Sequence, residues 1–158
     1  MYAESTSNQY GQRNVTVEEQ AGMIAERLFA RQQKRPLINK IKTLFNSQSD
    51  RLAQLELGET AVQPQHAQQQ TIAINQICGS ATSGRRQDFD SRFRPLNDHT
   101  KNRWVSIATA RRLGKQLPPV QLVQVGDQYF IEDGHHRISV ATAFGDHNIE
   151  ATVTMYSA

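Results

Sequence analysis

The stretch LPPVQLVQVGDQYFIEDGHHRISVATAFGDHNIEATV, residues 117–153, contains the clearest structural pattern of the chain. Residues 117–125 and 128–133 are rich in β-branched and aromatic side chains, and the Gly-Asp pair between them predicts a hairpin with a tight turn. Residues 135–145 have apolar side chains at helical spacing and end at a glycine, which predicts a helix. A last strand is predicted over 149–156.

The segment before this stretch adds a strand, a long loop and a helix. TIAINQI, residues 71–77, contains β-branched residues in partial alternation, which is typical of a strand. Residues 78–96 contain glycines and a proline and predict a loop. Apolar residues at helical spacing predict a helix over 100–115. The expected fold is therefore α+β, a small mixed sheet with helices over residues 71–158.

The N-terminal part predicts a polar tail followed by a helix. Residues 1–15 are rich in Ser, Asn and Gln and cannot bury enough apolar area to offset the entropy lost on ordering, so we expect disorder there. Thr16 and Glu19 have the spacing of a capping box, which predicts that a helix follows them. That helix should end near Lys34, because a proline follows two residues later.

A helical arm is expected over residues 16–58. Residues 36–47 place apolar side chains at helical spacing, and SDRLAQLELG, residues 49–58, predicts one more short helix. The Gln-rich segment 59–70 predicts a linker to the globular domain. Basic residues over 27–42 predict contact with nucleic acid or an anionic membrane surface, or else an arm that packs on the domain or on another subunit and forms a homo-oligomer.

The composition excludes two classes of protein. The 158 residues contain 18 Lys and Arg against 15 Asp and Glu, a formal charge of +3, which is compatible with nucleotide, nucleic-acid or other acidic partners. A single cysteine rules out an intramolecular disulfide. No apolar run approaches the roughly 18 residues of a membrane span, and no leader pattern is visible, so a cytoplasmic protein is predicted.

Asp133 and Gly134 separate the predicted strand 128–133 from the helix that follows. Glycine lets the backbone turn sharply and lets a ligand approach it closely. The first turn of a helix has backbone N–H groups without partners, and the helix dipole favours an anion there. His135, His136 and Arg137 are potential cations at the helix end that disfavours cations. The pattern therefore predicts an anion bound among them, with Arg137 holding a phosphate through two hydrogen bonds.

Other interpretations of this motif stay open. Asp133 is also a suitable N-cap for the helix, and the two histidines are also compatible with an ordinary exposed surface. A protein-built zinc site is disfavoured, because adjacent histidines point about 100° apart on a helix and no His-x-x-x-His pair or cysteine cluster is present. A magnesium ion carried by a nucleotide and contacted by Asp133 is the metal interaction that we expect.

Together these features resemble the core of the ParB/sulfiredoxin superfamily. The resemblance covers about residues 71–156 and is carried by the Pro-Val strand, the hairpin, the Ala-rich helix and, most specifically, the box from Asp133 to Arg137. In sulfiredoxins a catalytic cysteine stands before His-Arg, whereas this chain has His135 there, so sulfinic-acid reduction is not implied. The box looks most like the Asp-Gly-His-x-Arg type of the free serine kinases.

The resemblance implies a nucleotide, ATP, ADP or CTP, bound with Mg²⁺, or a phosphorylated small molecule. Gly134, His135, His136 and Arg137 would bind the phosphate, and Arg94 before Pro95 would add a contact. Phosphoryl transfer to a small hydroxyl compound would need a carboxylate, for which the candidates are Asp133, Asp88 and Asp90. Whether there is turnover stays open, and a nucleic-acid-associated regulatory module without catalysis is the alternative.

Overall fold

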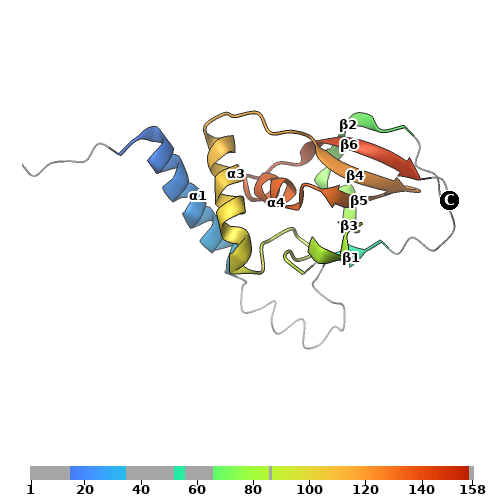
Figure 1. Cartoon of the computed structure of the whole chain (residues 1–158), viewed down its shortest axis with the longest axis horizontal. Coiled ribbons are helices and arrows are strands. Elements are labelled where there is room, and N and C mark those ends of the chain that lie inside the picture. The colour runs from blue at the N-terminus through green and yellow to red at the C-terminus, as the bar shows by residue number, and fades with distance from the viewer. Residues whose placement is uncertain (1–14, 35–51, 56–65, 86, 157–158) are drawn as a thin grey trace, which may run out of the picture.

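The computed structural model describes residues 15–34, 52–55, 66–85 and 87–156, and Figure 1 shows the arrangement of its elements. In chain order the elements are α1 (Val17–Gln33), β1 (Ala53–Gln54), β2 (Gln68–Ala73), η1 (Ile74–Gln76), β3 (Ile77–Ser80), η2 (Ser83–Arg85), η3 (Asp98–Thr100), α3 (Lys101–Arg112), β4 (Val120–Val125), β5 (Gln128–Asp133), α4 (His135–Ala143) and β6 (Asn148–Tyr156). Helices combined with a sheet that has parallel and antiparallel pairs confirm the predicted α+β class.

The six strands of the described residues form one sheet in the order β1-β3-β5-β4-β6-β2. The predicted hairpin is confirmed, because β4 and β5 pair antiparallel around the turn at Gly126. β6 returns beside β4 in parallel, and β3 pairs with β5 in parallel. Helix α4 connects β5 to β6, which run in opposite directions on either side of β4, and it lies against the face of the sheet.

The predicted strand over 71–77 is in fact the end of one strand and the beginning of another. β2 ends at Ala73, a 3₁₀ turn follows, and β3 begins at Ile77. Ile74 and Ile77 are both buried at a spacing of three residues, while Asn75 and Gln76 between them are exposed. That spacing matches one turn of 3₁₀ helix and interrupts the alternation of a strand.

The short connection between β2 and β3 requires a curled sheet. Three strands separate β2 from β3 in the sheet order, which would place them about 19 Å apart if the sheet were flat. The four Cα steps from Ala73 to Ile77 cover at most about 15 Å even when fully extended. The sheet therefore curves around the core, and its concave side receives α4.

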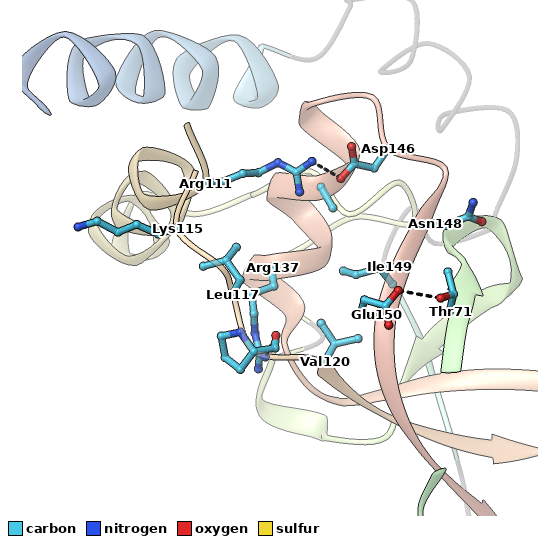
Figure 2. Close-up of a pocket in the computed structure, with 12 residues that line it drawn as sticks. Thr71, Arg111, Lys115, Leu117, Val120, Arg137, Asp146, Asn148, Ile149 and Glu150 are labelled. Carbon is cyan, nitrogen blue, oxygen red and sulfur yellow. Dashed lines mark hydrogen bonds and ion pairs between the residues drawn. The ribbon is translucent and has the colours of Figure 1, made fainter. Parts of the chain in front are cut away.

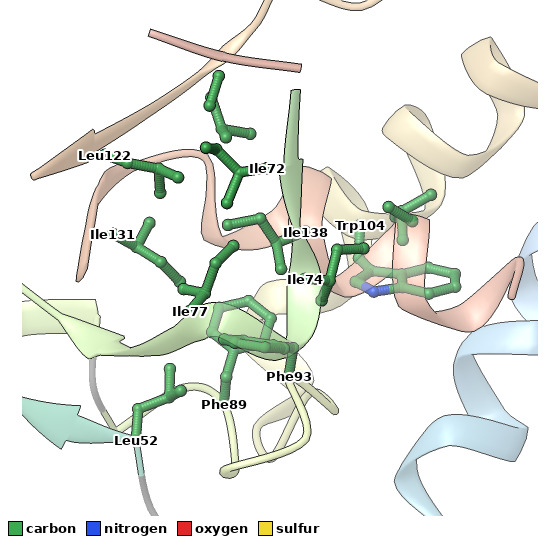
Figure 3. Close-up of a cluster of buried hydrophobic side chains, with 14 of the residues drawn as sticks. Leu52, Ile72, Ile74, Ile77, Phe89, Phe93, Trp104, Leu122, Ile131 and Ile138 are labelled. Atoms are coloured by element: carbon green, nitrogen blue, oxygen red, sulfur yellow. The ribbon is translucent and has the colours of Figure 1, made fainter. Parts of the chain in front are cut away.

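The core lies between this concave face and the helices. Figure 1 shows α4 next to the sheet, α3 beyond it and α1 outermost. The cluster in Figure 3 brings together side chains from the sheet and from α4 and α3, among them Ile77, Leu122, Ile131, Ile138 and Trp104, all of them buried. The indole N–H of Trp104 donates to the Ser139 hydroxyl at 2.8 Å, so the core also joins α3 to α4 by a hydrogen bond.

The capping box that opens α1 is confirmed. The Thr16 hydroxyl accepts from the Glu19 N–H at 3.1 Å, and the Thr16 N–H donates to the Glu19 carboxylate at 2.7 Å. The helix ends at the predicted position, with Lys34 as its C-cap. Phe29 on its buried face meets Trp104 edge-on, with ring centroids 5.5 Å apart, so the first helix of the predicted arm packs on α3.

Two segments outside α1 differ from the prediction. The short helix expected over 49–58 is wrong for residues 52–55, which are extended: β1 pairs with β3, and Leu52 is buried in the core. Strand β2 begins at Gln68, inside the segment 59–70 that was expected to be a linker. The tail over 1–14 and the helix over 36–47 lie outside the described residues. No helix of the described part is long and apolar enough to cross a membrane.

The contact between Phe29 and Trp104 gives a stability prediction. Phe29→Ala removes a ring that is 2% exposed and leaves a cavity, so we expect the free energy of unfolding to fall by about 3–5 kcal/mol. Urea unfolding followed by tryptophan fluorescence measures this directly, since Trp104 is the only tryptophan of the chain. Arg31→Ala, an exposed change on the same helix, is the control and should shift the value by less than about 0.5 kcal/mol.

Candidate anion-binding site

The junction between β5 and α4 depends on Gly134. This residue is the N-cap of α4 and has φ of 109°, a left-handed conformation. It is also buried against Val120: a Cβ at position 134 would lie 2.6 Å from Val120 Cγ1. No side chain among the described residues caps this end of the helix, so the prediction of Asp133 as the N-cap is wrong. The first N–H groups of α4 therefore have no side-chain acceptor in the described part of the chain.

The guanidinium of Arg137 links three segments of the described structure. Its Nη1 donates to the carbonyl oxygens of Pro118 at 2.7 Å and of Pro119 at 2.6 Å. Its Nη2 forms an ion pair with Asp133, whose side chain is 61% exposed. The guanidinium thus joins the first turn of α4 to the end of β5 and to the segment that leads into β4. Arg137 was predicted to hold a phosphate, but much of its hydrogen-bonding capacity is used within the protein.

His135 is buried and hydrogen bonded. Its Nε2 lies 2.8 Å from the hydroxyl of Ser80, the last residue of β3. The same hydroxyl accepts from the Thr82 N–H and donates to the Thr82 carbonyl. Because a hydroxyl has one hydrogen to donate, the His135 Nε2 carries the proton and donates to Ser80. Burial and the nearby Arg85 lower the pKa of His135 to about 4.

His136 is buried as well, but its ring has an unused polar atom. Its Nε2 is shielded from solvent and has no hydrogen-bond partner among the described residues. The ring meets Phe89 edge-on, with centroids 5.1 Å apart. Burial, followed by the charges of Arg103 and Arg85, lowers its pKa to about 4. Both histidines are therefore neutral at pH 7, and neither is the surface residue that one interpretation expected.

A narrow cleft opens at this N-terminus of α4. Its lining combines the box residues with two arginines from other elements, Arg85 at the end of η2 and Arg103 in the first turns of α3. Within the described ranges, the side chain of neither arginine forms a hydrogen bond or an ion pair. The cleft measures about 20 Å³, which is close to the space that one water molecule needs.

The structure brings some of the predicted site residues together and places others apart. Gly134, His135, His136, Arg137 and Asp133 all line the cleft. Three further candidates are in the loop before α3 and do not line it: Asp88, Asp90 and Arg94.

Asp90 and Arg94 hold their own loop together. The Asp90 carboxylate is fully buried and accepts from the N–H groups of Arg92 and Arg94 at 3.0 and 2.8 Å. It also pairs with the Arg94 guanidinium, whose Nε and Nη2 both lie 2.7 Å away. Between them Phe93 has φ of 58°, which is an unusual conformation for a bulky residue. The pair therefore stabilises this turn of the loop.

Asp88 lies nearer to the cleft. Its Oδ1 is 2.8 Å from His99 Nε2 and accepts from the Asn97 side chain at 3.2 Å. Its negative charge acts on both buried histidines and opposes the lowering of their pKa values. Of the two carboxylates in this loop, Asp88 is the one close enough to influence an anion at the cleft.

Two residues of the site were not indicated by sequence patterns. Arg103 is in a predicted helix, but nothing in its spacing shows that α3 turns this residue toward α4. Ser80 is the last residue of the short strand β3 and meets His135 from 55 positions away. Both relations arise from tertiary packing, so a periodic pattern along the chain does not contain them.

Comparison of the chain with protein-family models, with curated proteins and with solved structures found no match. Among the described residues, no group of three or more His, Cys, Asp and Glu side chains is arranged to hold a metal ion.

The constraint at Gly134 can be tested with a matched pair of substitutions. Gly134→Ala adds left-handed strain of about 1–2 kcal/mol and a collision with Val120 that costs about 1–3 kcal/mol more. Gly145→Ala is the control, because Gly145 also has positive φ, 85°, but open space around it. We expect urea unfolding to show the larger loss of stability for Gly134→Ala. Equal losses would contradict the close approach to Val120.

The two buried histidines predict a dependence of stability on pH. Their pKa values are about 4 in the folded protein and 6.5 ordinarily, so the unfolded chain binds protons first as the pH falls. Stability should be complete above pH 6.5 and decrease toward pH 4, by about 2 kcal/mol per histidine between pH 7.5 and 5.0. Urea unfolding of His136→Gln should show a smaller decrease, whereas the exposed control His147→Gln should match the wild type.

Proposed function

We propose that this chain is a ParB/sulfiredoxin-like domain that binds the terminal phosphoryl group of a nucleotide or phosphorylated small molecule at the cleft. The observation that carries the proposal is the position of Arg85 and Arg103. Both line the cleft at an uncapped helix N-terminus without a counter-ion among the described residues. Positive charge is unfavourable beside the positive end of a helix dipole, and a bound anion would compensate both.

The unpartnered nitrogen of His136 is a second, independent sign of a ligand. A buried polar atom without a hydrogen bond costs about 1–3 kcal/mol. His136 lines the cleft, and its Nε2 has no partner in the described structure. A phosphoryl oxygen accepting from this nitrogen would remove that cost. Because the ring is neutral at pH 7, it would contribute a hydrogen bond, and the two arginines would contribute the charge.

The size of the cleft limits what can enter it. A volume of about 20 Å³ admits about one oxygen of a phosphoryl group, so the rest of the phosphate and any base and ribose would lie outside. We expect binding to depend mainly on the terminal group, and ATP, ADP and CTP to differ less from one another than each differs from its nucleoside.

The carboxylates near the cleft could serve as a magnesium ligand and as a base in phosphoryl transfer to a small hydroxyl compound. Asp133 uses one oxygen for Arg137, and because its side chain is largely exposed, the other is available to a magnesium ion carried by the nucleotide. Asp88 is the nearer candidate for the base. Positioning and charge stabilisation account for most of the catalysis of phosphoryl transfer. Turnover would therefore require the phosphate binding proposed above.

Calorimetric titration of the full chain with ATP, ADP, CTP and pyrophosphate, each with Mg²⁺, tests the proposal. Charge-assisted hydrogen bonds contribute about 1.5–3 kcal/mol, so Arg85→Ala and Arg103→Ala should each weaken binding by roughly tenfold or more. Arg112→Ala is the matched control, because Arg112 is exposed on the same helix as Arg103 and does not line the cleft. Its affinity should equal that of the wild type.

Two results would count against the proposal. One is the absence of heat with every ligand at millimolar concentration. The other is binding that Arg85→Ala and Arg103→Ala leave unchanged. DNA binding that decreases with salt and survives both substitutions would instead favour the nucleic-acid-associated module. The described part of its basic segment is the exposed set Arg27, Arg31 and Lys34 on α1.

A further inference from the structure

A second and larger pocket lies on another side of Arg137. It measures about 320 Å³, which is within the range of small-molecule sites, whereas the cleft is far below it. α4 forms its base; the segment between α3 and β4 forms one wall, and the beginning of β6 with the neighbouring Thr71 of β2 forms the other. Figure 2 shows this arrangement. The pocket is separate from the proposed phosphate site and does not depend on it.

The walls of the pocket are mainly apolar. Leu117 and Pro118 come from the segment before β4, Val120 begins β4, and Ile149 lies near the start of β6. Leu117 and Ile149 are half-buried, so part of each side chain stays open to a ligand. Such a lining suits the body of a small ligand that contains several methylene groups, since burial of each one contributes about 0.8 kcal/mol.

Most charges around the pocket are already neutralised. Arg111 pairs with Asp146 at 2.5 Å and lies over the Phe144 ring at 5.1 Å. Arg137 is held by Asp133 and by two proline carbonyls. A ligand would therefore gain little from these two guanidinium groups.

Two lining charges remain without an ion-pair partner in the described part of the chain, Lys115 and Glu150. Lys115 is exposed, and its flexible side chain is on the α3 side. Glu150 is on β6, and one of its oxygens accepts from the Thr71 hydroxyl at 2.7 Å, so the carboxylate is oriented. Figure 2 shows Lys115 and Glu150 on opposite sides, with Leu117 between them.

We propose that this pocket binds a small zwitterion with an apolar body, whose anionic end meets Lys115 and whose cationic end meets Glu150. The opposite placement of the two charges favours a ligand with its own charges at its two ends. A molecule with a single charge would satisfy one wall and leave the other unpaired. A zwitterion with both charges on one carbon would reach one wall at a time.

Calorimetric titration of the full chain with four ligands tests the inference. The probe is 6-aminohexanoate, hexylamine and hexanoate each lack one of its charges, and L-leucine has both charges on one carbon. We expect 6-aminohexanoate to bind about threefold to tenfold more tightly than the other three, a difference on the scale of one exposed ion pair. Equal affinity for hexylamine and 6-aminohexanoate, or no binding of any ligand at millimolar concentration, would overturn the proposal.

Two variants assign the ends of the ligand. Lys115→Gln should weaken 6-aminohexanoate and hexanoate but leave hexylamine unchanged, whereas Glu150→Gln should weaken 6-aminohexanoate and hexylamine but leave hexanoate unchanged. Arg112→Gln, an exposed change outside the pocket, is the control. Both test positions are exposed, so the fold should be retained. Uniform effects on all ligands, or no effect of either variant, would refute the assignment.

Discussion

The close approach of Gly134 to Val120 is the constraint on which the rest of the site depends. A side chain at position 134 would collide with Val120, so the backbone of the β5–α4 junction can lie against β4 only when the residue is glycine. Arg137 then reaches back to the carbonyl groups of Pro118 and Pro119, directly before Val120. The packing of Gly134 on Val120 and the hydrogen bonds of Arg137 both hold the start of α4 against the segment that begins β4.

Because α4 begins so close to the sheet, its first two side chains are buried. His135 reaches the Ser80 hydroxyl at the end of β3, and His136 packs against Phe89. Burial makes their charged forms unfavourable, and the positive charges nearby add to this effect. Two residues that look like cations in the sequence are therefore neutral in the fold. The positive charge of the cleft comes from Arg85 and Arg103, which different elements bring to it.

Features set by neighbouring residues could be predicted from the sequence, whereas features set by packing could not. The capping box at Thr16, the turn at Gly126 and the helix after Gly134 involve residues a few positions apart, and the structure has them all. The single strand predicted over 71–77 fails because the sheet curls and the chain must change strands at Ile74. Arg103 reaches the site only through the packing of α3 on α4, and Arg137 pairs with carbonyl groups that are 18 and 19 residues away.

Arg137 also lies between two sites that suit different ligands. Arg137 lines both the cleft and the larger pocket, but Asp133 neutralises its charge and the carbonyl groups of Pro118 and Pro119 keep it in place. On one side, Arg85 and Arg103 leave an excess of positive charge, which suits a phosphoryl group. On the other, Lys115 and Glu150 balance each other across apolar walls, which suits a ligand without net charge. An arginine that bound the ligand directly would have to leave Asp133 and the proline carbonyls. The two sites thus differ in net charge and size although one side chain borders both.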